Sequence, residues 1–202
     1  MSLKKISKVQ PELFEFSNLN LQEAENEIKK YPINKKASAV LALLNLVQKQ
    51  NNNWIPLVAI KYVAKMLDIS YMQVYEVSTF YSMFNLTPVG KYFIQVCTTT
   101  PCMIRGAQKI TDVCKKYISK EQNNISENKL CSWVEVECLG ACVNGPMMQV
   151  NQDYFEDLDE NKSKELIQAL LEDKLPKSGS VKNRKNTAPE KGRTTLLEVK
   201  NA

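Results

Sequence analysis

Four of the six cysteines fall into two closely spaced pairs, Cys97 with Cys102 and Cys138 with Cys142. Four residues separate the first two cysteines, three separate the second two, and 35 residues lie between the pairs. Thiolate sulfur is the ligand that iron–sulfur clusters take from proteins, and four thiolates complete a two-iron cluster. The spacing leaves room for each pair to serve one iron. The pattern therefore predicts one 2Fe–2S cluster on these four residues and the transfer of single electrons.

Other metal and redox sites fit the sequence less well. The chain has no histidine, which excludes Cys/His zinc sites, Rieske clusters and Ser-His-Asp catalysis. Four-cysteine zinc sites usually contain C-x2-C pairs, and this chain lacks the motifs of thioredoxin-type dithiols and cubane clusters. Disulfides are disfavoured because the N-terminus shows no apolar signal region. A zinc-stabilised interaction module without electron transfer remains the alternative from another class.

The two remaining cysteines lie outside both pairs. Cys114 falls on the inward face of a predicted helix, and Cys131 stands beside a predicted strand. A buried free cysteine behaves as a small apolar side chain. We therefore expect both residues to pack in the core rather than to bind metal.

The stretches around the cysteines alternate between strand and helix patterns. Residues 91–96 are rich in β-branched and aromatic side chains, and residues 132–137 alternate as a half-buried strand. Helices are expected over 105–118 and 161–171, and short strands over 147–150 and 154–155. This β-α-β-β-β-α order predicts a small α/β sandwich of the thioredoxin kind. Parallel strands would bring both cysteine loops to one edge of the sheet.

Residues between the cysteines suit close contact with sulfur. Hydroxyl groups at 98–100, a helix N-terminus near Met103 and the side chain of Arg105 would all favour a reduced, more negative cluster. Gly140 and Gly145 permit tight turns and a close backbone approach.

The N-terminal region is helical in pattern from about residue 17 to 85. Asn20 with Glu23 resembles a capping box that opens a helix over 21–30, and Ser70 with Gln73 resembles another that opens a helix over 71–84. Between them, apolar residues recur at helical spacing. We therefore expect a helical bundle over 1–88, followed by an α/β domain over 89–173.

The basic charge of the chain is concentrated in its last segment. Residues 174–202 hold eight Lys/Arg and two acidic residues, although the whole chain has a formal net charge of only +5. This polar tail, interrupted by Pro and Gly, is expected to be disordered or laid along a partner. The sequence shows no basic folded face for nucleic acid and no apolar run near the ~20 residues that span a bilayer. We expect neither nucleic-acid binding nor direct membrane insertion.

The cysteine segments closely resemble a known family. VCTTTPCMIRGA (96–107) and VECLGACVNGPMMQVN (136–151) are similar to the thioredoxin-like 2Fe–2S subunit of bacterial NADH:quinone oxidoreductase, the E subunit of respiratory complex I. The likeness extends through 31–48 and 77–92 and reaches GRTT at 192–195, whereas 115–131 and the rest of the tail match poorly. The family's four cluster ligands fall on Cys97, Cys102, Cys138 and Cys142.

This resemblance implies a place in a larger enzyme. Family members pair through the helical region with a flavin-bearing subunit that oxidises NADH, so FMN and NADH are expected on that partner. The chain would be a non-catalytic subunit of NADH dehydrogenase, cytoplasmic, in the peripheral arm of a complex bound to the inner membrane. An equivalent diaphorase subunit of an NAD-linked hydrogenase or formate dehydrogenase carries the same motifs and remains an alternative.

Overall fold

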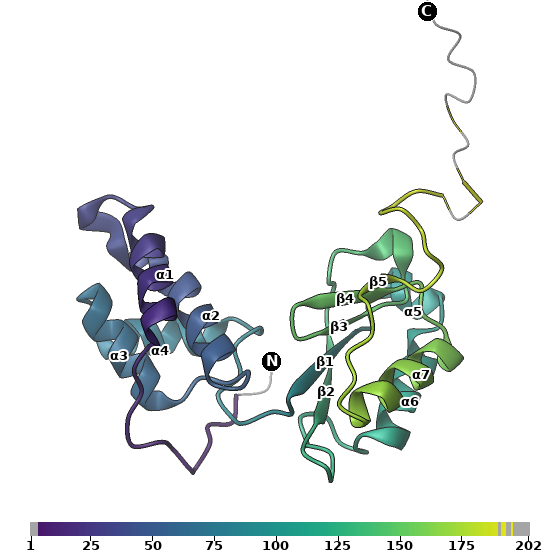
Figure 1. The fold of residues 1–202 in the computed structure, drawn as a ribbon, viewed down its shortest axis with the longest axis horizontal. Helices are drawn as coiled ribbons and strands as arrows, with labels where there is room; N and C mark the ends of the chain where they lie inside the picture. Colours follow the sequence, from purple (N-terminus) through teal and green to yellow (C-terminus); the bar gives the residue numbers. More distant parts are fainter. Residues whose placement is uncertain (1–3, 190, 193–194, 196–202) are drawn as a thin grey trace, which may run out of the picture. The chain divides into compact units, whose positions relative to one another are not determined.

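The chain divides into two compact units, Met1–Val89 and Gly90–Ala202, in the computed structural model (Figure 1). The structure describes residues 4–189, 191–192 and 195. The family resemblance at 192–195 therefore includes two residues, 193 and 194, that lie outside the described part.

The N-terminal unit is built from helices. They are α1 (Asn18–Lys29), the 3-10 helix η1 (Ile33–Ala39), α2 (Val40–Gln50), α3 (Leu57–Leu67) and α4 (Tyr71–Phe80). The predicted capping box of Ser70 and Gln73 is present at the start of α4. The expected cap of α1 at Asn20 is wrong, because Ser17 caps this helix by accepting a hydrogen bond from the Asn20 amide. The expected helix end at residue 84 is also too late, since α4 ends at Phe80.

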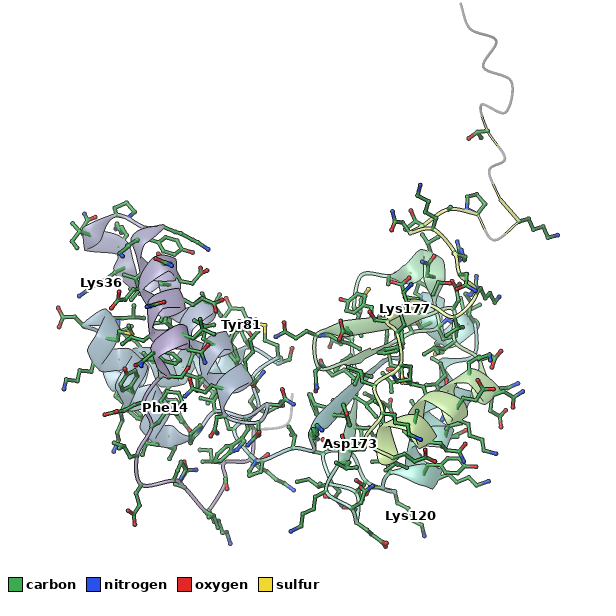
Figure 2. The ribbon with its side chains drawn as sticks, viewed as in Figure 1. Phe14, Lys36, Tyr81, Lys120, Asp173 and Lys177 are labelled. Atoms are coloured by element: carbon green, nitrogen blue, oxygen red, sulfur yellow. The ribbon has the colours of Figure 1, made fainter. Side chains whose placement is uncertain are left out.

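One apolar core holds these helices together. Leu43, Leu44 and Val47 of α2 belong to the same buried cluster as Ile60 and Leu67 of α3, and all five are fully buried. The chain before α1 adds aromatic side chains to this core, since Phe14 and Phe16 pack edge to face with each other and with Tyr62 of α3. Figure 2 labels Phe14 within this unit. The predicted apolar periodicity thus corresponds to faces that are buried within this unit.

The C-terminal unit contains a five-stranded mixed sheet in the order β2-β1-β3-β4-β5 (Figure 1). Its strands are β1 (Tyr92–Cys97), β2 (Cys131–Val136), β3 (Met148–Val150), β4 (Asp153–Glu156) and β5 (Gly179–Ser180). β1 runs parallel to β2 and antiparallel to β3, β3 runs antiparallel to β4, and β4 runs parallel to β5. The helices are α5 (Thr100–Ile104), α6 (Ala107–Tyr117) and α7 (Glu160–Leu171), with a 3-10 turn η2 (Cys142–Asn144).

Helices α6 and α7 share one core with the sheet. Ile110 and Val113 of α6 and Ile167 of α7 pack with Ile94 and Trp133 from the strands. Apolar side chains at helical spacing meet the alternating inward positions of β1 and β2, which produces the layered arrangement expected of this fold.

Two features of this unit differ from the sequence-based expectation. The helix expected over 105–118 begins slightly later, as α6 at Ala107, because Gly106 adopts a φ of +100°, and a separate short helix, α5, precedes it. The sequence predicts a segment from residue 174 that is disordered or laid along a partner, whereas β5 joins the sheet of its own domain. Local patterns in a polar, proline-containing segment cannot reveal this long-range pairing.

None of the helices in the described residues is long and apolar enough to cross a membrane.

Candidate two-iron cluster site

The two cysteine loops leave the same edge of the sheet. Cys97 is the last residue of β1 and lies opposite Val136, the last residue of the parallel strand β2. Cys138 follows two residues later, so both loops begin side by side, as expected for parallel strands. A backbone hydrogen bond of 3.3 Å from the Thr98 amide to the Val136 carbonyl joins the two loop starts.

The first pair is buried. Cys97 and Cys102 are both almost inaccessible to solvent, and Cys102 lies within the short helix α5. The Thr99 hydroxyl lies 3.4 Å from the Cys97 sulfur. Burial raises the pKa of Cys97, but hydrogen bonds from the Thr99 side chain, the Leu139 backbone and the Cys102 thiol outweigh it and leave the pKa lowered. Cys97 therefore reaches the thiolate form more easily than an ordinary cysteine.

Cys102 is its protonated counterpart. Burial, and then the neighbouring Cys97 as hydrogen-bond partner and as charge, raise the pKa of Cys102 to about 12. The charge of Cys142, from the other pair, acts in the same direction. Iron that bound at Cys102 would therefore have to displace a proton. The sulfurs of the two pairs lie within electrostatic range of one another.

The second pair is open to solvent. Cys138 is exposed and Cys142 is partly buried, and their sulfurs lie 3.7 Å apart. Two thiolates on one tetrahedral ion, each at about 2.3 Å from the metal, are separated by about 3.7 Å. The Gly140 amide donates a 3.3 Å hydrogen bond to the Cys138 sulfur, and the φ of +80° at Gly140 turns the backbone for this contact. Hydrogen bonding to Cys138, followed by burial, raises the pKa of Cys142.

A close approach brings the two pairs together. A Cβ atom at Gly145 would lie 3.0 Å from the Cys102 sulfur and 3.5 Å from the Cys142 carbonyl oxygen, so only glycine fits easily between them. Apolar side chains pack around the first pair: Ala107, Met147, Leu139, Ala141 and Tyr154. The Tyr154 hydroxyl donates a 2.7 Å hydrogen bond to the Leu139 carbonyl and so fixes the loop between Cys138 and Cys142.

The donor set and its grouping suit a two-iron cluster. Within the described residues, no three Cys, Asp or Glu side chains gather around one point that could hold a single ion. The sulfurs are instead arranged as two neighbouring pairs. The distance between the Cys138 and Cys142 sulfurs already matches that of two thiolates on one tetrahedral ion. A bound cluster of this type accepts and releases one electron, and the hydrogen bonds at Thr99 and Gly140 would stabilise its extra negative charge.

Cys114 and Cys131 lie elsewhere, in the core between α6 and β2. Both are completely buried. Burial raises the pKa of each thiol to about 12, with the charge of Cys131 a second cause for Cys114. Both side chains are therefore neutral packing groups near neutral pH.

Some of the residues around the site were not found from the sequence. Tyr154 contacts the loop between Cys138 and Cys142, and Asn144 joins the end of that loop to Glu156 of β4. Nothing in their local pattern separates them from ordinary strand and loop residues. The predicted helix start near Met103 is replaced by α5, which begins at Thr100, so Cys102 itself lies inside this helix.

Fold and site together define a thioredoxin-like ferredoxin with two pairs of cysteines at one sheet edge, and comparison with known proteins agrees. The family profile described as "Thioredoxin-like [2Fe-2S] ferredoxin" matches residues 24–171. The E subunit of the NADH-quinone oxidoreductase of Rickettsia typhi is 53% identical over 160 residues, which cover 79% of this chain and 94% of that protein. The mitochondrial NADH dehydrogenase [ubiquinone] flavoprotein 2 of Dictyostelium discoideum is 43% identical over 185 residues, or 92% of this chain and 75% of the relative.

The chain therefore belongs to the thioredoxin-like [2Fe-2S] ferredoxin family, and within it to the E subunits of NADH-quinone oxidoreductase. This confirms the resemblance seen in the cysteine segments, and with it a 2Fe–2S electron-transfer subunit of an oxidoreductase complex.

Solved structures show the same fold. A chain of the NAD+-reducing [NiFe]-hydrogenase in its H2-reduced state matches with a TM-score of 0.55 at 16% identity, over 66% of this chain. The air-oxidised form of that enzyme matches with the same TM-score at 15% identity. The matched region spans only about a fifth of the hydrogenase chain, 22% of its length in the first case.

Proposed function

We propose that Cys97, Cys102, Cys138 and Cys142 hold one 2Fe–2S cluster through which the chain passes single electrons in the NADH-oxidising module of respiratory complex I. The observation that carries this proposal is the grouping of the sulfurs. Two pairs meet at one sheet edge, with the Cys138 and Cys142 sulfurs 3.7 Å apart. Relatives about half identical over most of their length carry the name of this complex, which favours it over the diaphorase of a hydrogenase or formate dehydrogenase.

The proposed partner is a flavin-bearing subunit that holds FMN and binds NADH. This chain has no Gly-rich nucleotide fingerprint after a strand, so neither FMN nor NADH would be held chiefly here. Apolar side chains next to the cysteines, Met103, Ile104 and Val143, are exposed in the C-terminal unit. Such side chains beside an open cluster edge suit contact with another subunit.

The proposed division of labour follows the three segments of the chain. The helical region 1–88 would bind the partner, since Met72, Phe80 and Met83 of its α4 and the following turn are exposed. The domain 89–173 would carry the cluster, and within the tail 174–202 strand β5 adds to its sheet. Such a subunit would act in the cytoplasmic peripheral arm of the membrane-bound complex and would catalyse nothing by itself.

The cluster assignment can be tested on the isolated full-length chain, purified without oxygen. We expect a red-brown protein with two irons per chain and an EPR signal after reduction by dithionite. Cys102→Ala and Cys142→Ala should each abolish the chromophore, because each iron needs two thiolates.

Cys114→Ala is the matched control for these variants. It removes a thiol as buried as that of Cys102 from the core and should leave the visible spectrum intact. Full retention of the cluster in either ligand variant would contradict the assignment, as would a colourless wild-type protein that contains zinc. Co-purification with a flavoprotein tests the partner, and purification without one from cells that express the whole complex would count against it.

A further inference from the structure

The segment 179–188, here called the C-terminal strap, folds back onto the loop that carries Cys142. It begins as β5, which pairs with the end of β4 through Phe155–Gly179 and Glu156–Ser180. A further backbone hydrogen bond of 3.0 Å runs from the Val181 amide to the Glu156 carbonyl. The family profile ends at residue 171, so its match does not include the strap.

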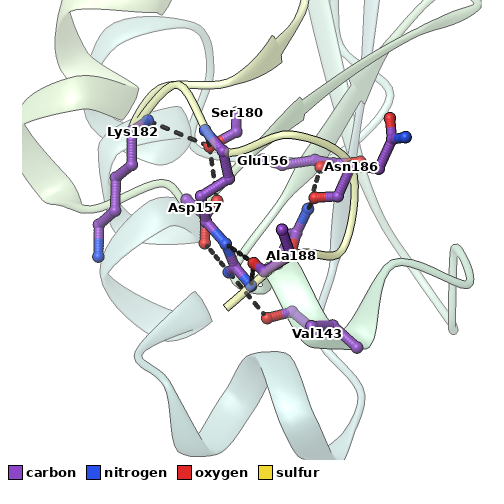
Figure 3. Close-up of polar contacts among 9 residues, drawn as sticks. Val143, Glu156, Asp157, Ser180, Lys182, Asn186 and Ala188 are labelled. Carbon is purple, nitrogen blue, oxygen red and sulfur yellow. Dashed lines mark hydrogen bonds and ion pairs between the residues drawn. The ribbon is translucent and has the colours of Figure 1, made fainter. Parts of the chain in front are cut away.

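A buried ion pair fastens the strap to the domain. Arg184 and Asp157 approach to 2.9 Å, and their side chains are only 7% and 0% exposed. The second carboxylate oxygen of Asp157 accepts a 2.6 Å hydrogen bond from the Ser180 hydroxyl (Figure 3). Charged side chains are rarely buried to this extent unless they are paired, and here each has a partner supplied by the other segment.

The same guanidinium reaches the cysteine loop. The Arg184 Nη1 atom donates to the Val143 carbonyl at 3.3 Å, and its Nε and Nη2 atoms donate to the Ala188 carbonyl at 2.9 and 2.7 Å. Val143 is the residue directly after Cys142. The Arg184 side chain therefore joins Asp157, just after β4, to the end of the strap and to the backbone beside a proposed cluster ligand. Figure 3 labels three of its partners, Asp157, Ala188 and Val143.

Asn144 forms a second link between the same parts. Its amide nitrogen donates to the Glu156 carboxylate at 2.6 Å and to the Asn186 carbonyl of the strap at 2.8 Å. Its own backbone carbonyl accepts a 2.6 Å hydrogen bond from the Asp157 amide. The two residues after Cys142 are thus held from β4 on one side and from the strap on the other.

We propose that the strap positions the Cys142 loop for the cluster, and that Arg184 is its principal positioning residue. This inference rests on the cluster assignment proposed above. The first cysteine pair is held by burial, whereas the second pair is open, so its geometry depends more on neighbouring hydrogen bonds. Residues that orient metal ligands without touching the metal change metal affinity by about 10-fold to 100-fold when they are removed.

The test compares variants of the full-length chain after anaerobic reconstitution with iron and sulfide. Arg184→Met removes the guanidinium but leaves Asp157 as a buried, uncompensated charge that can destabilise the fold. Arg184→Met combined with Asp157→Asn removes both charges and avoids this penalty. Arg184→Lys retains the charge opposite Asp157 but cannot bridge the Val143 and Ala188 carbonyls as the planar guanidinium does.

The control is Asp173→Asn, which breaks the Lys91–Asp173 pair at the opposite end of β1 from Cys97.

The first readout is the rate at which visible absorbance is lost after a strong iron chelator is added, measured well below the melting temperature. The second is the EPR line shape of the reduced protein. We expect the double variant to lose its cluster about 10-fold faster than wild type, with a shifted EPR signal, and Arg184→Lys to be intermediate. Asp173→Asn should behave as wild type. A folded double variant, or a folded Arg184→Lys variant, with the wild-type rate and spectrum would overturn the proposal. A wild-type chain that holds no cluster would instead overturn the cluster assignment, and this inference with it.

Discussion

The two cysteine loops of one site are stabilised in opposite ways. Cys97 and Cys102 are buried among apolar side chains, with the first at a strand end and the second in a helix. Cys138 and Cys142 belong to an irregular loop, with Cys138 exposed and the loop held by polar contacts. Burial holds the first pair in place and raises the pKa of Cys102, whereas hydrogen bonds to Cys97 outweigh burial and lower the pKa of that thiol. Cys138 is exposed, so the second pair is more accessible and depends more on hydrogen bonds for its geometry. The proposed cluster site thus has a buried side and a side that is open to solvent.

The largest expected effect comes from filling the close approach between the loops. Gly145→Ala places a methyl group 3.0 Å from the Cys102 sulfur, although the φ of −67° at this position suits alanine. We expect most of the iron to be lost, measured as iron per chain and visible absorbance after reconstitution. Gly140→Ala is the matched control, because its Cβ would meet nothing within 4 Å.

The Gly140→Ala control should strain the backbone at residue 140 but should not displace any cysteine sulfur. Its φ of +80° costs an alanine about 1–2 kcal/mol, so the melting temperature should fall by about 2–8 °C while the cluster is retained. Equal cluster loss in the two variants would mean that the Gly145 contact is not what joins the loops.

A second experiment compares the reactivity of the two pairs in the cluster-free chain. Iodoacetamide attacks thiolates, and at pH 8 a thiol of pKa about 12 carries roughly a thousandfold less thiolate than an ordinary one of pKa 9.0. Because Cys138 is exposed and Cys102 is buried with a raised pKa, we expect Cys138 to be alkylated first and Cys102 to be protected. Mass spectrometry of peptides over a time course measures both.

The pH dependence of this experiment has a definite sign. Since the pKa of Cys102 is raised to about 12, a change from pH 7 to pH 9 leaves it protonated, and its protection should persist over that range. Cys114 and Cys131, with pKa values also raised to about 12, should be equally protected in the same digests. Rapid labelling of Cys102 in the folded chain would contradict the view that this residue is protected while Cys138 is accessible.

The smallest expected effect concerns the hydroxyl beside Cys97. Thr99→Val removes a contact of 3.4 Å to the sulfur, which would otherwise stabilise the more negative reduced state. The reduction potential should therefore fall, by roughly 20–40 mV for about 1 kcal/mol or less of hydrogen bonding. Redox titration followed by EPR measures this shift. A potential that rises instead would show that Thr99 does not donate to the sulfur.

The first pair could be placed from the sequence more completely than the second. A strand-forming run ends at Cys97, and parallel strand ends meet at one sheet edge, so spacing and strand pattern were enough to bring the loops together. The break between α5 and α6 depends on one glycine at positive φ, which a helical apolar pattern conceals. The contacts of Arg184 and Asn186 with the Cys142 loop join residues about 40 positions apart, and no local propensity encodes such pairing.

Strand β5 has another consequence, for the solubility of shortened forms of the protein. It occupies the hydrogen-bonding side of β4 that β3 leaves unpaired. A chain truncated after α7 would expose β4 as an edge strand with unpaired backbone groups. Such edge strands can pair with strands of other molecules and so promote aggregation. The two residues of β5 thus cover the edge of the sheet. Recombinant fragments that include them should remain monodisperse at concentrations at which shorter fragments precipitate.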